Sequence, residues 1–132
     1  MENKKVLVVD DDMSIIQLIT VNLEDDGWNV YQAQDGTQAV QAAHREKPSV
    51  IILDIMLPAG SGQRVLEHLQ SSTITAFIPV ILMSALSQED LRKKYFSFEK
   101  TLQKSRIVDF FRKPFDIELL KKSVNMQHKS KQ

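Results

Sequence analysis

Four short apolar runs recur along the 132-residue chain and constrain its fold more than any other feature. They span residues 6–9, 50–53, 80–83 and 107–111 and hold almost no polar residues, a pattern typical of strands buried on both faces of a sheet. A fifth run, residues 28–33, alternates more between apolar and polar residues, as expected of a strand at a sheet edge. We therefore predict five strands.

Apolar residues at helical spacing fill the segments between these runs, for example Ile16, Ile19 and Leu23. Gly27 and Pro48 stand where the first two of these patterns end. A regular alternation of strand and helix implies right-handed crossovers. The predicted fold is α/β, a doubly wound five-stranded parallel sheet with five helices distributed over both faces.

The helix expected after the fourth strand looks longer than the others. Ser87 followed by Asp90 suggests a capped start, and one apolar stripe continues through Leu91, Tyr95, Phe98 and Leu102. We predict an extended fourth helix that runs to about Lys104. Its other face is basic, and Phe96 lies off the stripe, either as a lone surface aromatic or as an anchor for a partner.

Length and composition indicate one domain over residues 1–127, with a polar tail over 128–132. The chain has no cysteine, which excludes thiolate metal sites, and its three histidines show no ligand-like spacing. The first apolar run has only four residues before Asp10, so we expect no signal peptide, no membrane span and a cytoplasmic protein.

Charge is distributed unevenly along the chain. Residues 1–91 hold 5 basic and 13 acidic residues, whereas residues 92–132 hold 12 basic and 4 acidic ones. The basic part either forms solvated helix faces or meets an acidic partner. Nucleic acid is not the expected partner, because the basic residues are scattered and no recognition motif accompanies them.

Polar residues with complementary chemistry follow four of the predicted strands. Asp10 and Asp11 follow the first, Asp54 the third, Ser84 the fourth and Lys113 the fifth. In an open parallel sheet, ligands bind outside the carboxyl ends of the strands. We therefore expect three carboxylates, one hydroxyl and one ammonium group at the same edge.

Neighbouring carboxylates repel each other unless a cation lies between them, and Mg²⁺ with its preference for oxygen ligands suits this group. An aspartate can attack phosphorus, and a nearby lysine can neutralise the transferred phosphoryl group. These residues therefore predict Mg²⁺-dependent phosphoryl transfer. Asp12, the third acid of the run, is expected to be the N-cap or a first-turn residue of the following helix instead.

The segments "KVLVVDDD", "VIILDIMLPAGSG", "PVILMSA" and "FFRKPF" resemble, in this order, the signature blocks of the receiver domains of two-component response regulators. The resemblance covers residues 4 to about 125 and implies the flavodoxin-like strand order 2-1-3-4-5. It also implies a cis peptide between Lys113 and Pro114. The site roles that it implies are: Asp54 as phosphoacceptor, Asp11, Asp54 and the Met56 backbone carbonyl as Mg²⁺ ligands, Asp10 as a ligand through water, Ser84 as switch hydroxyl, Lys113 as phosphate-binding cation and Phe110 as switch aromatic.

The resemblance further implies a phosphorylation-dependent signalling domain and not an enzyme in the usual sense. A sensor histidine kinase or a histidine phosphotransfer protein would donate the phosphoryl group. A downstream effector would contact the surface made by the fourth helix, the fifth strand and the last helix. Ser84 and Lys113 lie 29 positions apart, which is longer than usual in the family. The alternative is a phosphate-independent interaction module on the same fold.

Overall fold

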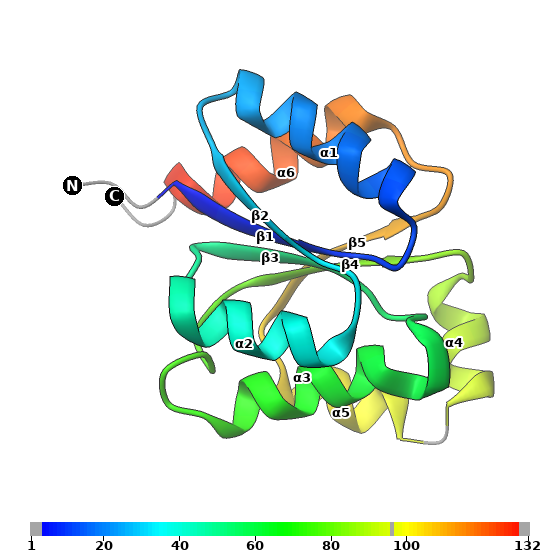
Figure 1. Ribbon diagram of the computed structural model, residues 1–132. Coiled ribbons are helices and arrows are strands. Elements are labelled where there is room, and N and C mark those ends of the chain that lie inside the picture. Colours follow the sequence, from blue (N-terminus) through cyan, green and yellow to red (C-terminus); the bar gives the residue numbers. More distant parts are fainter. Residues whose placement is uncertain (1–3, 96, 130–132) are drawn as a thin grey trace.

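The computed structural model describes residues 4–95 and 97–129, which form a parallel sheet covered by helices on both faces (Figure 1). Its strands lie in the order β2-β1-β3-β4-β5, and every neighbouring pair is parallel. Their bounds are β1 (Lys5–Val9), β2 (Asn29–Ala33), β3 (Val50–Asp54), β4 (Val80–Ser84) and β5 (Ile107–Arg112). The predicted fold class and strand order are confirmed.

Two helices, α1 (Met13–Asp25) and α6 (Ile117–Lys129), cover one face of the sheet and lie above it in Figure 1. The other face is covered by α2 (Gly36–Glu46), α3 (Ser61–Ser71), α4 (Gln88–Lys94) and α5 (Phe98–Lys104). A short 3₁₀ turn, η1 (Pro58–Gly60), precedes α3.

Each face of the sheet has its own hydrophobic core, and alternate residues along a strand belong to one core or the other. On β1, Val6 and Val8 pack against α1 and α6, whereas Leu7 and Val9 face α2 and α3. All five residues of β3 and of β4 are buried, which explains why their sequences carry no apolar and polar alternation. β2 is an edge strand, and its first and fourth residues are exposed.

A buried tryptophan joins the last helix to the turn after the first. Trp28, only 2% exposed, precedes β2 at the amino end of the sheet, and its Nε1 donates a hydrogen bond to Asn125 Oδ1 at 2.8 Å. Asn125 Nδ2 in turn donates to Asp26 Oδ2 at 3.0 Å. These bonds anchor α6 to the segment between α1 and β2.

The prediction of one extended fourth helix is wrong. The segment forms two helices, because α4 ends at Lys94 and Tyr95 adopts extended backbone angles (φ −115°, ψ 112°) before α5 begins at Phe98. The predicted start and end hold, since the Ser87 side chain caps α4 and α5 ends at Lys104. Phe96, considered above as a partner anchor, lies outside the described residues.

The length of an unbroken helix gives a physical reason for this break. A straight helix over 87–104 would be about 27 Å long, whereas a five-residue strand such as β4 spans about 17 Å, so the helix would extend beyond the sheet. On either side of the break, Leu91 and Phe98 are both fully buried in the same core. An ion pair between Arg92 and Glu99 connects the two helices.

The last helix includes the first two positions of the expected polar tail. Helix α6 continues through positions 128 and 129, and the remaining tail residues, 130–132, lie outside the described part of the chain. Within the described ranges, no helix has the length and apolar character needed to cross a membrane.

Candidate functional site

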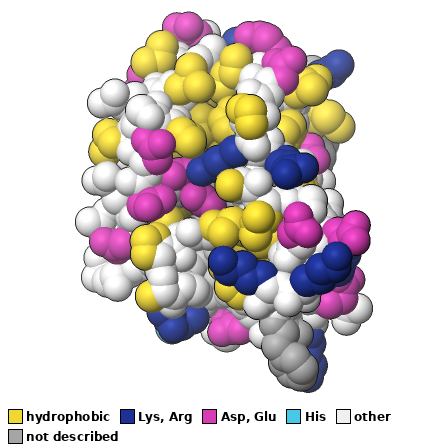
Figure 2. Space-filling view, turned by 90° about the vertical axis from the view of Figure 1, so that its right-hand side faces the viewer, with side chains coloured by type: hydrophobic (Ala, Val, Ile, Leu, Met, Phe, Trp, Pro, Cys, Tyr) yellow, Lys and Arg dark blue, Asp and Glu magenta, His cyan; other side chains and the backbone are white. Residues whose placement is uncertain are grey.

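The predicted acidic residues meet at the carboxyl edge of the sheet. Asp10 directly follows β1, Asp54 is the last residue of β3, and Asp11 lies in the loop that leads to α1. One carboxylate oxygen from each lies within 4.8 Å of the others. Asp10 and Asp54 are 0% and 4% exposed, whereas Asp11 is open to solvent. Figure 2 faces this edge, where acidic side chains gather beside basic ones.

Lys113 places a cation between the two buried carboxylates. Its Nζ lies 2.7 Å from Asp10 Oδ2 and 3.0 Å from Asp54 Oδ2. The lysine follows β5, its backbone N–H donates to the Ser84 carbonyl at 2.7 Å, and the predicted cis peptide to Pro114 is present. This cation offsets the repulsion that crowding of the carboxylates would otherwise cause.

Burial and pairing act in opposite directions on the titration of this pair. Loss of hydration raises the pKa of Asp10, and the hydrogen bond from Lys113 opposes this effect only in part. Burial alone would lower the pKa of Lys113, but the hydrogen bond to Asp10 and the charge of Asp54 together raise it. Lys113 therefore stays protonated, while the carboxyl group of Asp10 binds a proton more readily than an exposed aspartate.

Backbone amides fix the orientation of both buried carboxylates. The N–H of Met56 donates to Asp54 Oδ1 at 2.8 Å, and the N–H of Asp12 donates to Asp10 Oδ1 at 2.9 Å. Each carboxylate thus has one oxygen on the backbone and one on Lys113. Asp12 itself caps α1 as predicted, because its side chain accepts hydrogen bonds from the N–H and the hydroxyl of Ser14.

Within the described residues, the Ser84 side chain makes no hydrogen bond to Asp10, Asp54 or Lys113, although the Ser84 carbonyl accepts one from the Lys113 backbone N–H. Ser84 ends β4 and is fully buried, and its Oγ accepts a hydrogen bond from the Leu86 N–H at 2.9 Å. Phe110 on β5 is half-buried beside the core that contains α2 and α3, and it pairs with Leu82 across the sheet.

The donor set fits a magnesium ion. Three carboxylates supply oxygen atoms close enough together to share one cation, and the exposed position of Asp11 leaves room for the waters that Mg²⁺ retains. Histidine and cysteine, which soft transition metals prefer, do not contribute to this cluster.

Sequence reasoning identified the five side chains of this edge but missed two features. One is the backbone support of the carboxylates by Met56 and Asp12, for which the residue types carry no signal. The other is the bond between Lys113 and Asp10, because the lysine was expected only to bind phosphate.

Comparison with known proteins defines the class to which this site belongs. The response regulator receiver domain family matches residues 6–125, so the chain belongs to this family. It is a receiver domain of the kind found in two-component response regulators.

Particular relatives agree with this assignment. The DNA-binding dual master transcriptional regulator RpaA of Synechocystis is 38% identical over 114 residues, which cover 86% of this chain and 44% of RpaA. The alkaline phosphatase synthesis transcriptional regulatory protein PhoP of Bacillus subtilis is 41% identical over 87 residues, 66% of this chain and 35% of PhoP. The matched region thus spans less than half the length of these relatives, both of which are transcriptional regulators.

Solved structures show the same fold over almost the whole chain. The receiver domain of the Francisella response regulator 1452 has a TM-score of 0.81 at 34% identity and covers 98% of this chain and 100% of its own. The chemotaxis response regulator CheY4 of Vibrio cholerae has a TM-score of 0.79 at 26% identity, with 95% of this chain and 98% of its own covered.

Proposed function

We propose that this receiver domain accepts a phosphoryl group on Asp54 from a phosphohistidine donor in the presence of Mg²⁺, and that the modified domain controls a protein partner. The donor would be a sensor histidine kinase or a histidine phosphotransfer protein. The observation that carries this proposal is the position of Asp54: it ends a buried strand, with a lysine ammonium at 3.0 Å and two more carboxylates beside it.

The nucleophile of the proposed transfer is the Asp54 carboxylate. One Asp54 oxygen attacks the phosphorus, the bond between phosphorus and the donor imidazole nitrogen breaks, and the imidazole leaves with a proton from solvent. The product on Asp54 is an acyl phosphate. The Met56 N–H already holds Asp54 Oδ1, so the carboxylate is oriented before the donor arrives.

Charge neutralisation accounts for the remaining residues. Lys113 contacts Asp54 Oδ2, and we expect it to follow the negative charge onto the phosphoryl oxygens. The Ser84 oxygen accepts from the Leu86 N–H, which leaves the Ser84 hydroxyl hydrogen to be donated to a phosphoryl oxygen. Asp11, Asp54 and the Met56 carbonyl would hold Mg²⁺, with Asp10 contributing through water. When bound, the ion supplies positive charge that offsets the phosphoryl and carboxylate oxygens.

The partner surface would consist of α4, β5 and α6, the last of which corresponds to the last helix of the family fold. Ser84 pairs with Arg112, and Leu82 pairs with Phe110, across β4 and β5. A shift of Ser84 toward a phosphoryl group would therefore be transmitted to β5. Phe110, half-buried on that strand, is the side chain that we expect to change position.

The test is the intact mass of the protein after incubation with acetyl phosphate and Mg²⁺. We expect the gain of one phosphoryl group in the wild type and in Asp25→Asn, an exposed aspartate at the end of α1, and no gain in Asp54→Asn or without Mg²⁺. If neither acetyl phosphate nor a phosphorylated histidine kinase modifies the wild type, the proposal is wrong and a phosphate-independent interaction module becomes the better description.

A further inference from the structure

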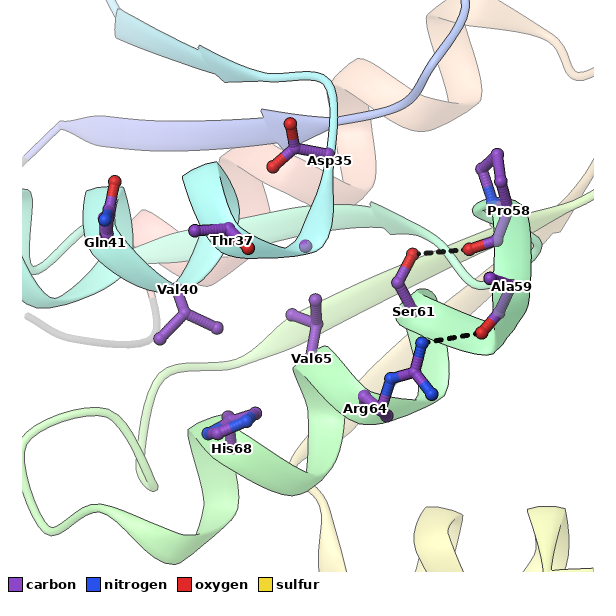
Figure 3. A pocket seen from close by; sticks show the side chains of 11 residues that line it. Asp35, Thr37, Val40, Gln41, Pro58, Ala59, Ser61, Arg64, Val65 and His68 are labelled. Carbon is purple, nitrogen blue, oxygen red and sulfur yellow. Dashed lines mark hydrogen bonds between the residues drawn. The ribbon is translucent and has the colours of Figure 1, made fainter.

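A second concave site lies between helices α2 and α3, separate from the acidic residues. It has a volume of about 470 Å³ and is bounded by the first turns of α2, by η1 and by one face of α3 (Figure 3). None of the residues assigned to phosphoryl transfer contributes to its lining. Its volume falls within the range of about 300–1,000 Å³ that is typical of small-molecule sites.

The floor of this α2–α3 pocket is apolar. Val40 and Val65 face it from the two helices (Figure 3), and Pro58 of η1 also lines it. The helices approach closely at Gly36, where an added Cβ would lie 3.2 Å from Ser61 Cβ and 3.3 Å from Val65 Cγ2. The two helices that form the walls of the pocket are therefore in close contact at this end.

The positively charged side chain of Arg64 lies at the edge of the pocket, next to its apolar floor. Arg64 donates one hydrogen bond, from Nη2 to the Ala59 carbonyl at 2.7 Å, and pairs with no carboxylate in the described part of the chain. A guanidinium carries five N–H donors, so most of them remain available. His68 lies one turn further along α3 on the same side (Figure 3).

Asp35, which also lines the pocket, does not pair with the Arg64 guanidinium. Asp35 accepts a hydrogen bond from the Gln38 N–H at 2.8 Å and caps α2, and Figure 3 shows it directed away from Arg64. An arginine next to an apolar surface is matched by a ligand that carries a carboxylate on an apolar body, because the guanidinium fork fits the two carboxylate oxygens.

We propose that the α2–α3 pocket binds a small organic acid, with its apolar part on Val40 and Val65 and its carboxylate on Arg64. The occupant is a small molecule and not a peptide, given the volume of the pocket and the single available guanidinium. This binding goes beyond phosphoryl transfer and does not depend on it, so it is measured on the unphosphorylated protein.

Phenylacetate is a suitable probe, and phenylacetamide has the same shape without the charge. In ¹H–¹⁵N correlation spectra, phenylacetate should shift the amides of the pocket lining saturably, with a dissociation constant of about 1 mM. Phenylacetamide should bind about tenfold more weakly, the ratio expected when one charged hydrogen bond is lost. Acetate, which lacks the apolar body, should leave these amides unshifted.

Arg64→Gln tests the carboxylate contact and retains a side chain amide that can still donate to the Ala59 carbonyl. It should lose about tenfold in phenylacetate affinity. The matched control is Arg106→Gln, an exposed arginine outside the pocket. The spectra of both variants show directly whether they remain folded.

Three results would overturn the proposal. The first is equal affinity for phenylacetate and phenylacetamide, and the second is equal loss of affinity in both arginine variants. The third is the absence of saturable shifts with phenylacetate when an acidic, phenylalanine-containing peptide does shift the same amides. That last result would make the pocket a protein interface. Asp54→Asn should bind phenylacetate like the wild type, which keeps this test independent of phosphoryl transfer.

Discussion

At the scale of single residues, Gly62 supports the site without carrying any chemistry. It lies in the first turn of α3, and a Cβ at this position would be 2.3 Å from the Ile55 carbonyl oxygen and 2.6 Å from its carbon. Ile55 directly follows Asp54. A side chain at position 62 would therefore push against the backbone that carries the proposed phosphoacceptor.

We expect Gly62→Ala to lower the free energy of unfolding by about 2–4 kcal/mol, because backbone atoms cannot move aside cheaply. Gly60→Ala is the control: Gly60 has φ +71° but no heavy atom within 4 Å of an added Cβ, so only backbone strain of about 1 kcal/mol applies. Urea unfolding followed by circular dichroism measures both. Equal losses in the two variants would contradict the steric explanation.

Asp10 makes stability depend on pH in an unusual direction for an aspartate. Burial raises its pKa above the usual 3.8, so the folded state binds the proton more tightly than the unfolded state. Stability from this group is present at acidic pH and declines as the pH rises through the folded pKa. Asp10→Asn cannot ionise, so it should lack this decline in the free energy of unfolding. It should therefore be more stable than the wild type near neutral pH when no divalent cation is present.

The measurement is the urea midpoint between about pH 4 and pH 7 in the presence of EDTA. The midpoint of Asp10→Asn should change less with pH over this range than that of the wild type. Asp25→Asn, at an exposed position, should follow the wild-type curve within about 0.5 kcal/mol. A lower midpoint for Asp10→Asn at neutral pH would show that the ion pair with Lys113 outweighs the loss of hydration.

At the scale of helices and strands, the sequence predicts the elements that the sheet buries on both faces. The apolar runs that form most of β1, β3 and β4 are buried throughout. A short run without polar residues is typical of a strand that is covered on both faces. The strand order came from the family resemblance and not from the runs themselves. The break between α4 and α5 was missed, because Leu91, Tyr95, Phe98 and Leu102 keep helical spacing across it. Only Ser97, a residue type common at helix starts, marks the new helix in the sequence.

The second of these helices should contribute to folding as much as a core element does. Phe98 at its start is 0% exposed, so we expect Phe98→Ala to cost about 3–5 kcal/mol. Phe77, in the segment before β4, is 76% exposed, and Phe77→Ala should cost no more than about 0.5 kcal/mol. The free energies of unfolding of the two variants, measured by chemical denaturation, test this expectation. A small effect at position 98 would mean that α5 is a loosely attached addition.

At the scale of the whole molecule, the site depends on residues that are far apart in the sequence. Four different strands place these residues: Asp54 and Ser84 end β3 and β4, and Asp10 and Lys113 directly follow β1 and β5. The parallel arrangement brings the strand ends to one edge. This convergence could be predicted, because it follows from strand direction alone. The exact partners could not: the contact of Lys113 with Asp10 depends on the path of the loop after β5, which residue types do not specify.

The anchoring of Trp28 has a practical consequence for spectroscopy. It is the only tryptophan of the chain, and it lies at the amino end of the sheet, about one strand length, ~17 Å, from the acidic edge. Its emission should therefore shift on unfolding but stay constant when Mg²⁺ or acetyl phosphate is added to the folded protein. We therefore expect Trp28 fluorescence to report the folded fraction without interference from ligands bound at the acidic edge.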